Sequence, residues 1–176
     1  MFEKISEQLK ARANKIKLIG FDVDGVLTDS SIYIGETGEV FKQYCSLDGH
    51  GMKMALQFGI KVCIISARKS PCVHKRFEGW GFDDDVHTGT EDKWGKMQEI
   101  IKKYNLKEEE VAFIGDDMLD IPVLEKVGLA TSPPNRHYSV DQHIHYITEN
   151  AGGKGAAREL CDLILTCQGK IPSTEC

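Results

Sequence analysis

"IKLIGFDVDGVLTD" (residues 16–29) is a stretch in which an apolar run ends at two aspartates, Asp22 and Asp24. The aliphatic and β-branched residues of 16–22 predict a buried strand. Two carboxylates this close together repel each other unless a positive group lies between them. The stretch therefore predicts a cation or a basic side chain beside the end of a core strand.

The composition of the chain is that of an ordinary globular protein. It has 176 residues, of which 41% are hydrophobic and 28% charged, with a formal net charge of −5. We expect a single domain over residues 1–176. The acidic balance argues against a nucleic-acid partner or a membrane surface, and the apolar runs are too short to span a bilayer.

The N-terminus and the cysteines indicate a cellular compartment. Residues 1–17 lack the apolar core of a signal peptide, and the spacing of Phe2, Ile5 and Leu9 predicts a short amphipathic helix. The six cysteines are scattered without metal-like spacing. We therefore expect a cytoplasmic protein without structural disulfides.

Predicted strands and helices alternate along the rest of the chain. Apolar runs predict strands at 60–67, 85–87, 111–117, 128–130 and 144–148, and helical spacing predicts helices over 49–59, 70–80, 93–104, 118–128 and 155–168. This alternation is typical of a three-layer, doubly wound α/β fold with a parallel sheet covered on both faces. Residues 31–46 break it, because two alternating runs around the turn 35–38 predict a β-hairpin.

Chemically active side chains follow the predicted strands. In sheets of this kind, ligands bind beyond the carboxyl ends of the strands. The residues predicted to gather there are Asp22, Asp24, Ser66, Arg68, Lys93, Asp116, Asp117 and Asp120. Clustered carboxylates select a hard cation such as Mg²⁺, and Mg²⁺ with nearby Lys and Arg suits a transferring phosphoryl group.

The spacing of the first two acids indicates their chemical roles. A carboxylate at the end of a strand can attack phosphorus and form an aspartyl-phosphate. A second carboxylate two residues later lies on the same side of an extended chain. It can protonate the leaving oxygen and then deprotonate the water that clears the intermediate. The pair Asp22 and Asp24 fits this division of labour.

The motif "DVDGVLTD" (22–29), a Ser at the end of the second strand, a Lys before a helix and "GDD" (115–117) together resemble the haloacid dehalogenase superfamily of phosphatases. More narrowly, residues 24–51, 115–128 and 151–165 resemble the 3-deoxy-D-manno-octulosonate 8-phosphate phosphatase family. These are small, nearly capless enzymes of lipopolysaccharide sugar synthesis. The resemblance covers nearly the whole chain.

The resemblance implies a role for each residue of the phosphoryl site. Asp22 would be the nucleophile and a Mg²⁺ ligand, and Asp24 the general acid/base with its backbone carbonyl on the metal. Asp116 would ligate Mg²⁺, with Asp117 and Asp120 supporting the site. Ser66 and Lys93 would bind the phosphoryl group.

The resemblance also implies the substrate contacts and the assembly. Arg68 would meet the carboxylate of a phosphorylated sugar acid. The hairpin 31–46 would replace a cap domain and build a homotetramer whose neighbours cover each other's active sites. The glycine-rich segment 152–155 and Arg158 precede a tail that would close over a site.

Several residues keep a second interpretation. Ser66 could cap a following helix, and Asp120 could be an ordinary acid in a first helical turn. Asp48 could orient the base of the hairpin or touch substrate. Arg76 and Arg158 could bind substrate or be solvated helix charges. His143 and His145 have no third ligand at a suitable spacing, which argues against a zinc site.

Other functions compete with this one. Ser66-Ala67-Arg68 replaces the family's usual Thr-Gly-Arg, and "HTGTED" (87–92) stands where relatives commonly have Gln-Gly. A nononate or acylneuraminate 9-phosphate phosphatase is therefore an alternative, although Arg68 favours the octulosonate. A phospho-accepting receiver domain would need adjacent acids after its first strand, whereas here those acids are spaced D-x-D. A non-catalytic partner on the same scaffold is the last alternative.

Overall fold

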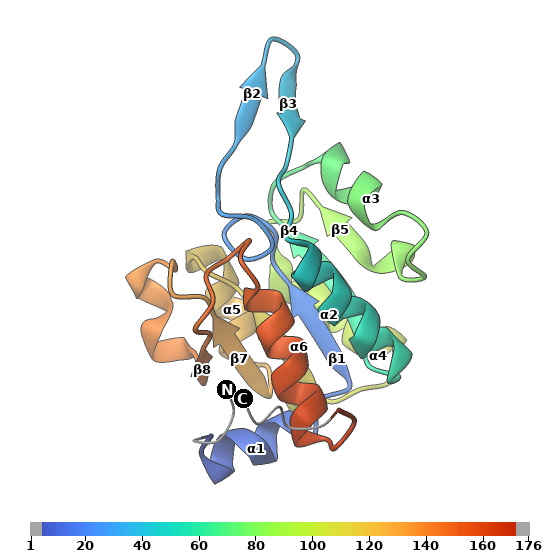
Figure 1. Cartoon of the computed structure of the whole chain (residues 1–176), viewed down its shortest axis with the longest axis vertical. Coiled ribbons are helices and arrows are strands. Elements are labelled where there is room, and N and C mark those ends of the chain that lie inside the picture. Colours follow the sequence, from blue (N-terminus) through green and yellow to red (C-terminus); the bar gives the residue numbers. More distant parts are fainter. Residues whose placement is uncertain (1–4, 172–176) are drawn as a thin grey trace.

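A parallel sheet forms the centre of the computed structural model, which describes residues 5–171. Its strands are β1 (Leu18–Phe21), β4 (Lys61–Ser66), β5 (Val86–Thr88), β6 (Val111–Ile114), β7 (Leu129–Ser132) and β8 (Tyr146–Ile147). The six strands lie in the order β5-β4-β1-β6-β7-β8, and all pairs are parallel (Figure 1). In the register, Phe21 lies opposite both Ile64 and Ile114, so the carboxyl ends of the three central strands meet at one edge.

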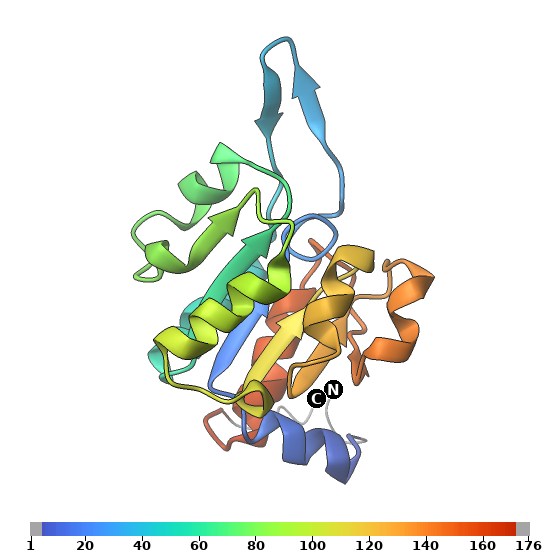
Figure 2. The same cartoon turned by 180° about the vertical axis from the view of Figure 1, so that it is seen from behind.

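Helices cover both faces of the sheet, as predicted. One buried cluster joins the sheet to α1 (Glu7–Ala13), α2 (Ser46–Gln57), α3 (Pro71–Phe77) and α6 (Ala156–Cys167). The other joins it to α4 (Lys93–Lys103) and α5 (Ile121–Leu124). Along β1, Ile19 and Phe21 enter the first cluster and Leu18 the second, because successive side chains of a strand point to opposite faces. Figures 1 and 2 show the two covering layers from opposite sides.

The hairpin consists of β2 (Tyr33–Gly35) and β3 (Gly38–Phe41) and projects from the body of the molecule (Figure 1). It is shorter than the predicted 31–46, because β3 ends at Phe41, and α2 begins at Ser46 rather than at Gly49. A Cβ at Gly49 would lie 2.6 Å from the Arg76 guanidinium, so this glycine permits close packing inside a helix.

The prediction of one helix over 118–128 is wrong. The segment begins with a 3-10 turn, which is followed by the four-residue α5. The side chain of Asp120 turns inward and accepts hydrogen bonds from the backbone of the preceding loop, which tightens the turn. Pro122 lies in the first turn of α5, where its missing N–H costs no hydrogen bond. The predicted edge strand is confirmed as β8.

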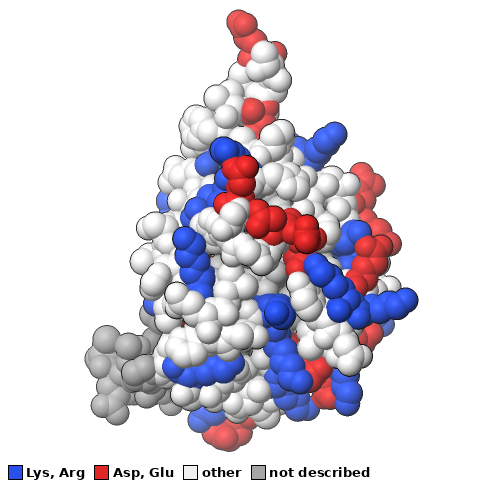
Figure 3. All heavy atoms as spheres, turned by 90° about the vertical axis from the view of Figure 1, so that its right-hand side faces the viewer, with Lys and Arg blue, Asp and Glu red and all other residues white. Residues whose placement is uncertain are grey.

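The remaining predictions concern the chain ends, the cysteines and the surface. Phe2 and the tail 172–176 lie outside the described residues, so a single domain over 1–176 stays a prediction. Among the described cysteines, those at 45, 63, 72, 161 and 167 are free. None of the described helices is both long and apolar enough to cross a membrane. On the face shown in Figure 3, Lys and Arg are interspersed with Asp and Glu.

Candidate active site

The end of β1 presents the DxD motif at the centre of the sheet. The Asp22 amide donates to the Ile114 carbonyl at 3.0 Å, which extends the pairing with β6 by one residue. Gly25 has a φ of +88°, and a Cβ there would lie 1.9 Å from a carboxylate oxygen of Asp116. Only glycine therefore allows the loop after β1 to approach the loop after β6 so closely.

A cavity of about 490 Å³ opens at this edge of the sheet. Its lining residues are Asp22, Asp24, Ser30, Ile32, Ser66, Ala67, Arg68, Lys93, Asp116, Asp117, Leu119 and Asp120. All the residues predicted for phosphoryl transfer and metal binding thus face one space, together with Arg68. Their convergence follows from the parallel sheet, whose strand ends meet at one edge.

Lys93 is the buried cation of the site. Its Nζ lies 2.8 Å from Asp22 Oδ1 and 2.6 Å from Asp120 Oδ1. Burial opposes the charge on Lys93, but the two carboxylates outweigh it and raise its pKa. Because α4 begins at Lys93, the helix fixes where this charge stands beside the nucleophile candidate.

Asp120 links Lys93 to the loop after β6. Its side chain is 1% exposed, and while Oδ1 binds Lys93, Oδ2 accepts hydrogen bonds from the amides of Asp116 (3.0 Å) and Asp117 (3.2 Å). The alternative of an ordinary first-turn acid does not account for these contacts. Asp117 is exposed, and its side chain accepts from the Met118 amide at 2.7 Å.

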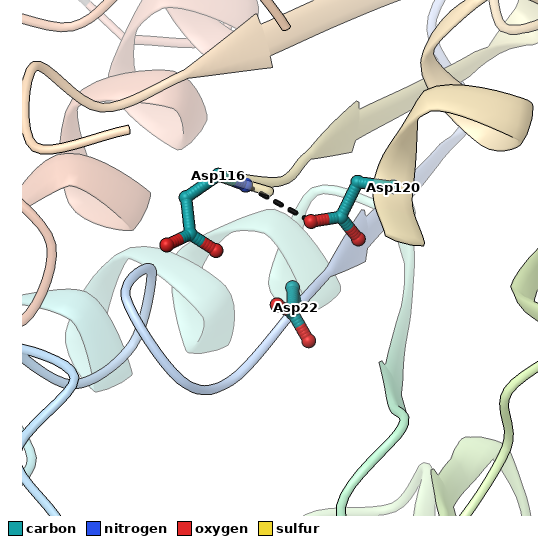
Figure 4. Close-up of side chains that lie close together, drawn as sticks. All are labelled: Asp22, Asp116 and Asp120. Atoms are coloured by element: carbon teal, nitrogen blue, oxygen red, sulfur yellow. Dashed lines mark hydrogen bonds between the residues drawn. The ribbon is translucent and has the colours of Figure 1, made fainter. Parts of the chain in front are cut away.

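The acids form a group suited to a cation. Oxygens of Asp22, Asp116 and Asp120 lie within 4.8 Å of one another, and their carboxylates face a common space (Figure 4). Burial, followed by the neighbouring carboxylates, raises the pKa of Asp22 to about 7 and that of Asp116 to about 8. Both Asp120 oxygens already have partners, which leaves Asp22 and Asp116 as the side chains available to a metal. Hard oxygen donors crowded in this way fit Mg²⁺.

Asp24 has two basic neighbours, one of which the sequence analysis missed. Lys42 Nζ donates to Asp24 Oδ1, and Arg68 Nε lies 3.3 Å from Asp24 Oδ2. In the sequence, Lys42 follows an alternating hairpin run and looks like a solvated charge. The only available signal was its i,i+3 spacing from Glu39, with which it forms a 3.1 Å ion pair.

Comparisons with known proteins agree with this geometry. Residues 85–160 match a family model described as haloacid dehalogenase-like hydrolase. The chain is 40% identical over 167 residues to the 3-deoxy-D-manno-octulosonate 8-phosphate phosphatase of Escherichia coli, covering 95% of this chain and 88% of that one. The chain belongs to this phosphatase family.

Solved structures of family members superpose closely on the chain. The Yersinia pestis phosphatase has a TM-score of 0.90 at 36% identity, covering 94% of this chain and 89% of that one. The Moraxella catarrhalis phosphatase, solved with magnesium, phosphate and 3-deoxy-D-manno-octulosonate (KDO), has a TM-score of 0.89 at 33% identity and covers 94% of both chains. The chain is therefore a phosphomonoesterase of the haloacid dehalogenase type, and the receiver-domain alternative is wrong.

Three residues predicted to bind substrate lie outside the cavity of this phosphatase. Asp48 is buried and accepts from the Arg158 amide at 2.8 Å, so it caps α6, and burial raises its pKa. Arg158 pairs through Nε with Asp162 at 2.7 Å. The Arg76 guanidinium lies 4.6 Å from the centre of the Trp80 ring. Within one chain, the contacts of these residues are those of helix capping and packing, and their role in substrate binding stays a prediction.

Ser66 lies in the cavity wall, and two residues outside it support the loop after β1. Ser66 Oγ donates to the Arg68 carbonyl at 3.4 Å instead of capping α3, and the side chain lines the cavity. Gly152 packs against the loop after β1, where a Cβ would lie 1.8 Å from the Gly25 carbonyl oxygen. Asn135, which the sequence analysis missed, joins these glycines by donating to Gly25 O (2.9 Å) and accepting from Gly152 N (2.7 Å). No periodicity or motif marks such a residue in the sequence.

Proposed function

We propose that this phosphatase hydrolyses 3-deoxy-D-manno-octulosonate 8-phosphate to the free sugar acid and phosphate, in the synthesis of lipopolysaccharide precursors. The observation that carries the proposal is the grouping of Asp22, Lys93 and Asp116 in one cavity of a chain whose relatives bear this name. The enzyme depends on Mg²⁺, in keeping with the magnesium bound by the Moraxella catarrhalis relative.

The carboxylate of Asp22 attacks phosphorus, and the bond from phosphorus to the sugar oxygen breaks. Lys93 contacts Asp22 Oδ1, so it fixes the orientation of the nucleophile and offers positive charge to the phosphoryl oxygens. The carboxylates of Asp22 and Asp116 and the Asp24 carbonyl would hold Mg²⁺. When bound, Mg²⁺ neutralises charge on the phosphoryl group.

Asp24 moves the proton in both halves of the reaction. It protonates the sugar oxygen, which leaves with the electron pair of the broken bond. It then takes a proton from the water that attacks phosphorus in the aspartyl-phosphate, releasing phosphate and the Asp22 carboxylate. Ser66 lines the same cavity and binds a phosphoryl oxygen through its hydroxyl.

Arg68 selects the sugar acid. Its side chain is 47% exposed at the cavity, so it is free to form a bidentate pair with the sugar carboxylate. This contact favours a sugar acid over a sugar phosphate without a carboxylate. A nononate or acylneuraminate 9-phosphate also carries a carboxylate and remains the alternative substrate.

A homotetramer built by the hairpin is part of the proposal, as is a cytoplasmic location. Large apolar side chains are exposed along the hairpin, at Ile32, Tyr33, Ile34, Val40 and Phe41. Most of its surface is uncharged in Figure 3. An isolated protomer rarely leaves so continuous an apolar surface in water, which supports contact with further copies near the active site. The free cysteines support a reducing compartment.

The test is phosphate release with Mg²⁺ from 3-deoxy-D-manno-octulosonate 8-phosphate, a nononate 9-phosphate and p-nitrophenyl phosphate. We expect a strong preference for the octulosonate, and Asp22→Asn should lower kcat by about 10⁴-fold or more. Asp141→Asn, on the exposed surface, is the matched control. Weak turnover of all three compounds would show that the octulosonate is not the substrate. Turnover that survives Asp22→Asn would show that Asp22 is not the nucleophile.

A further inference from the structure

We propose that Lys42, the residue directly after β3, is a positioning residue that holds Asp24 in place for proton transfer. The base of the hairpin therefore takes part in catalysis within its own chain. The inference rests on the proposed function, because it concerns the step in which the sugar oxygen is protonated.

The two basic partners of Asp24 differ in how firmly they are held. The Lys42 side chain is 1% exposed, whereas that of Arg68 is 47% exposed. They occupy different oxygens, Lys42 on Oδ1 and Arg68 near Oδ2. Arg68 can leave for the sugar carboxylate without losing buried contacts. Lys42 cannot, since a buried ammonium needs its anionic partners.

A second acid fixes Lys42 from the other side. Glu39 Oε2 lies 3.1 Å from Lys42 Nζ, and Ser70 Oγ donates to Glu39 Oε1. Burial opposes ionisation of Glu39, but the hydrogen bond from Ser70 and the charge of Lys42 outweigh it and lower its pKa. The chain of contacts thus runs from Ser70, before α3, through Glu39 of β3 and Lys42 to Asp24.

This arrangement assigns different tasks to the two oxygens of Asp24. When Arg68 turns to the substrate, Oδ2 is released toward the cavity while Oδ1 stays bound to Lys42. A carboxyl group fixed through one oxygen presents the other in a narrow range of directions, which proton transfer to the leaving oxygen requires. Lys42 itself is not among the cavity-lining residues, so its role is to position Asp24 rather than to bind substrate.

The decisive experiment compares leaving groups. For Lys42→Met, kcat/KM should fall about 10²-fold with 3-deoxy-D-manno-octulosonate 8-phosphate or β-glycerophosphate, whose alkoxide leaving groups need a proton. With p-nitrophenyl phosphate, whose leaving group departs as a stable anion, it should fall only a few-fold. KM for the sugar phosphate should change little. Gln43→Met, at the exposed neighbouring position, should preserve the ratio between the substrates.

A double variant separates positioning from structural support. Lys42→Met alone leaves Glu39 without its cation, whereas Lys42→Met with Glu39→Gln removes the unpaired charge. We expect the double variant to regain the melting temperature of the wild type but not its turnover of alkyl phosphates. Glu39→Gln alone keeps Lys42 on Asp24 and should show a smaller loss with the same preference.

Two results would overturn the inference: equal losses for alkyl and aryl phosphates, or recovery of alkyl turnover in the double variant. Failure of the proposed function is distinguishable, because it is seen in the wild type. If the wild-type enzyme cleaves β-glycerophosphate but not 3-deoxy-D-manno-octulosonate 8-phosphate, the proposed substrate is wrong. The role of Lys42 can still be tested by comparing β-glycerophosphate with p-nitrophenyl phosphate.

Discussion

The two aspartates of the DxD motif lie only two residues apart, yet their surroundings differ in origin and in burial. Asp22 belongs to a set formed by strand ends and a helix start, with Lys93 and Asp120, whose side chains are 9%, 2% and 1% exposed. Asp24 belongs to a set completed by the hairpin and the loop after β4, and its side chain is 24% exposed.

This difference matches the work of the two groups. A nucleophile needs one fixed position relative to phosphorus, and a buried network attached to the sheet provides it. A group that gives and later takes a proton has to exchange partners during the cycle, which a half-open setting with one mobile arginine allows. The hairpin therefore bears on Asp24 and not on Asp22.

Removal of Asp120 is the strongest way to break the buried set. Asp120→Ala leaves Lys93 with a single acid and leaves the Asp116 and Asp117 amides without their acceptor. We expect a loss of about 3 kcal/mol in the free energy of unfolding, because two backbone amides lose their acceptor and a buried ammonium loses one of its two anionic partners. Phosphatase activity should fall about 10²-fold as Lys93 and the Asp116 loop lose their positions. Urea unfolding and steady-state kinetics measure the two effects.

The matched control is Asp141→Asn, which removes an ion pair with Arg136 on the exposed surface. Its cost should stay below about 1 kcal/mol. If Asp120→Ala were no more costly than this control, the buried set would not be the rigid part of the site.

The Mg²⁺ dependence of stability is the next largest effect. The pKa of Asp116 is raised from 3.8 to about 8, so its ionisation destabilises the fold. In EDTA, stability should therefore fall as pH rises from about 4 through about 8, the range between the unfolded and folded values. Mg²⁺ at 100 times its Kd should restore about 2.7 kcal/mol at pH 8 and less at pH 5, where the ligands are protonated.

Thermal melting at several pH values, with and without Mg²⁺, checks this expectation. Asp116→Asn should show a smaller fall in melting temperature as pH rises, since Asp22 still ionises within the range, and it should lose the response to Mg²⁺. Asp141→Asn should keep both effects at the size seen in the wild type. If the melting temperature of the wild type in EDTA rises between pH 5 and pH 8, the inference that burial and neighbouring carboxylates raise the pKa of Asp116 is wrong.

The smallest effect on the protomer should come from the free surface of the hairpin. Ile34 is 69% exposed, so Ile34→Glu should change the free energy of unfolding by no more than about 0.5 kcal/mol. If the hairpin forms the assembly, light scattering should show a lower mass. The Mg²⁺ shift of the melting temperature should remain, because the Asp22 set lies on the sheet. Phe58→Glu, which changes an exposed apolar residue on another element, should keep the mass of the wild type.

Residue patterns were sufficient to locate the Asp22 set. Apolar runs identify the strands, and a parallel sheet places their carboxyl ends at one edge. The acids and Ser66 meet there because β1 lies between β4 and β6. The motifs around them also predicted the family. None of this required knowing which side chains touch.

Only the tertiary structure decided how these residues are held. Lys42 contacts an acid 18 positions away, and Lys93 contacts Asp120 at a separation of 27. The structure also made Asp48 a cap of α6 and placed Arg76 against Trp80. The sequence does not show whether a charged side chain is solvated or buried, because its burial depends on which distant segments pack around it. Burial and pairing depend on contacts between distant segments, whereas periodicity and strand ends are local and can be read from the chain alone.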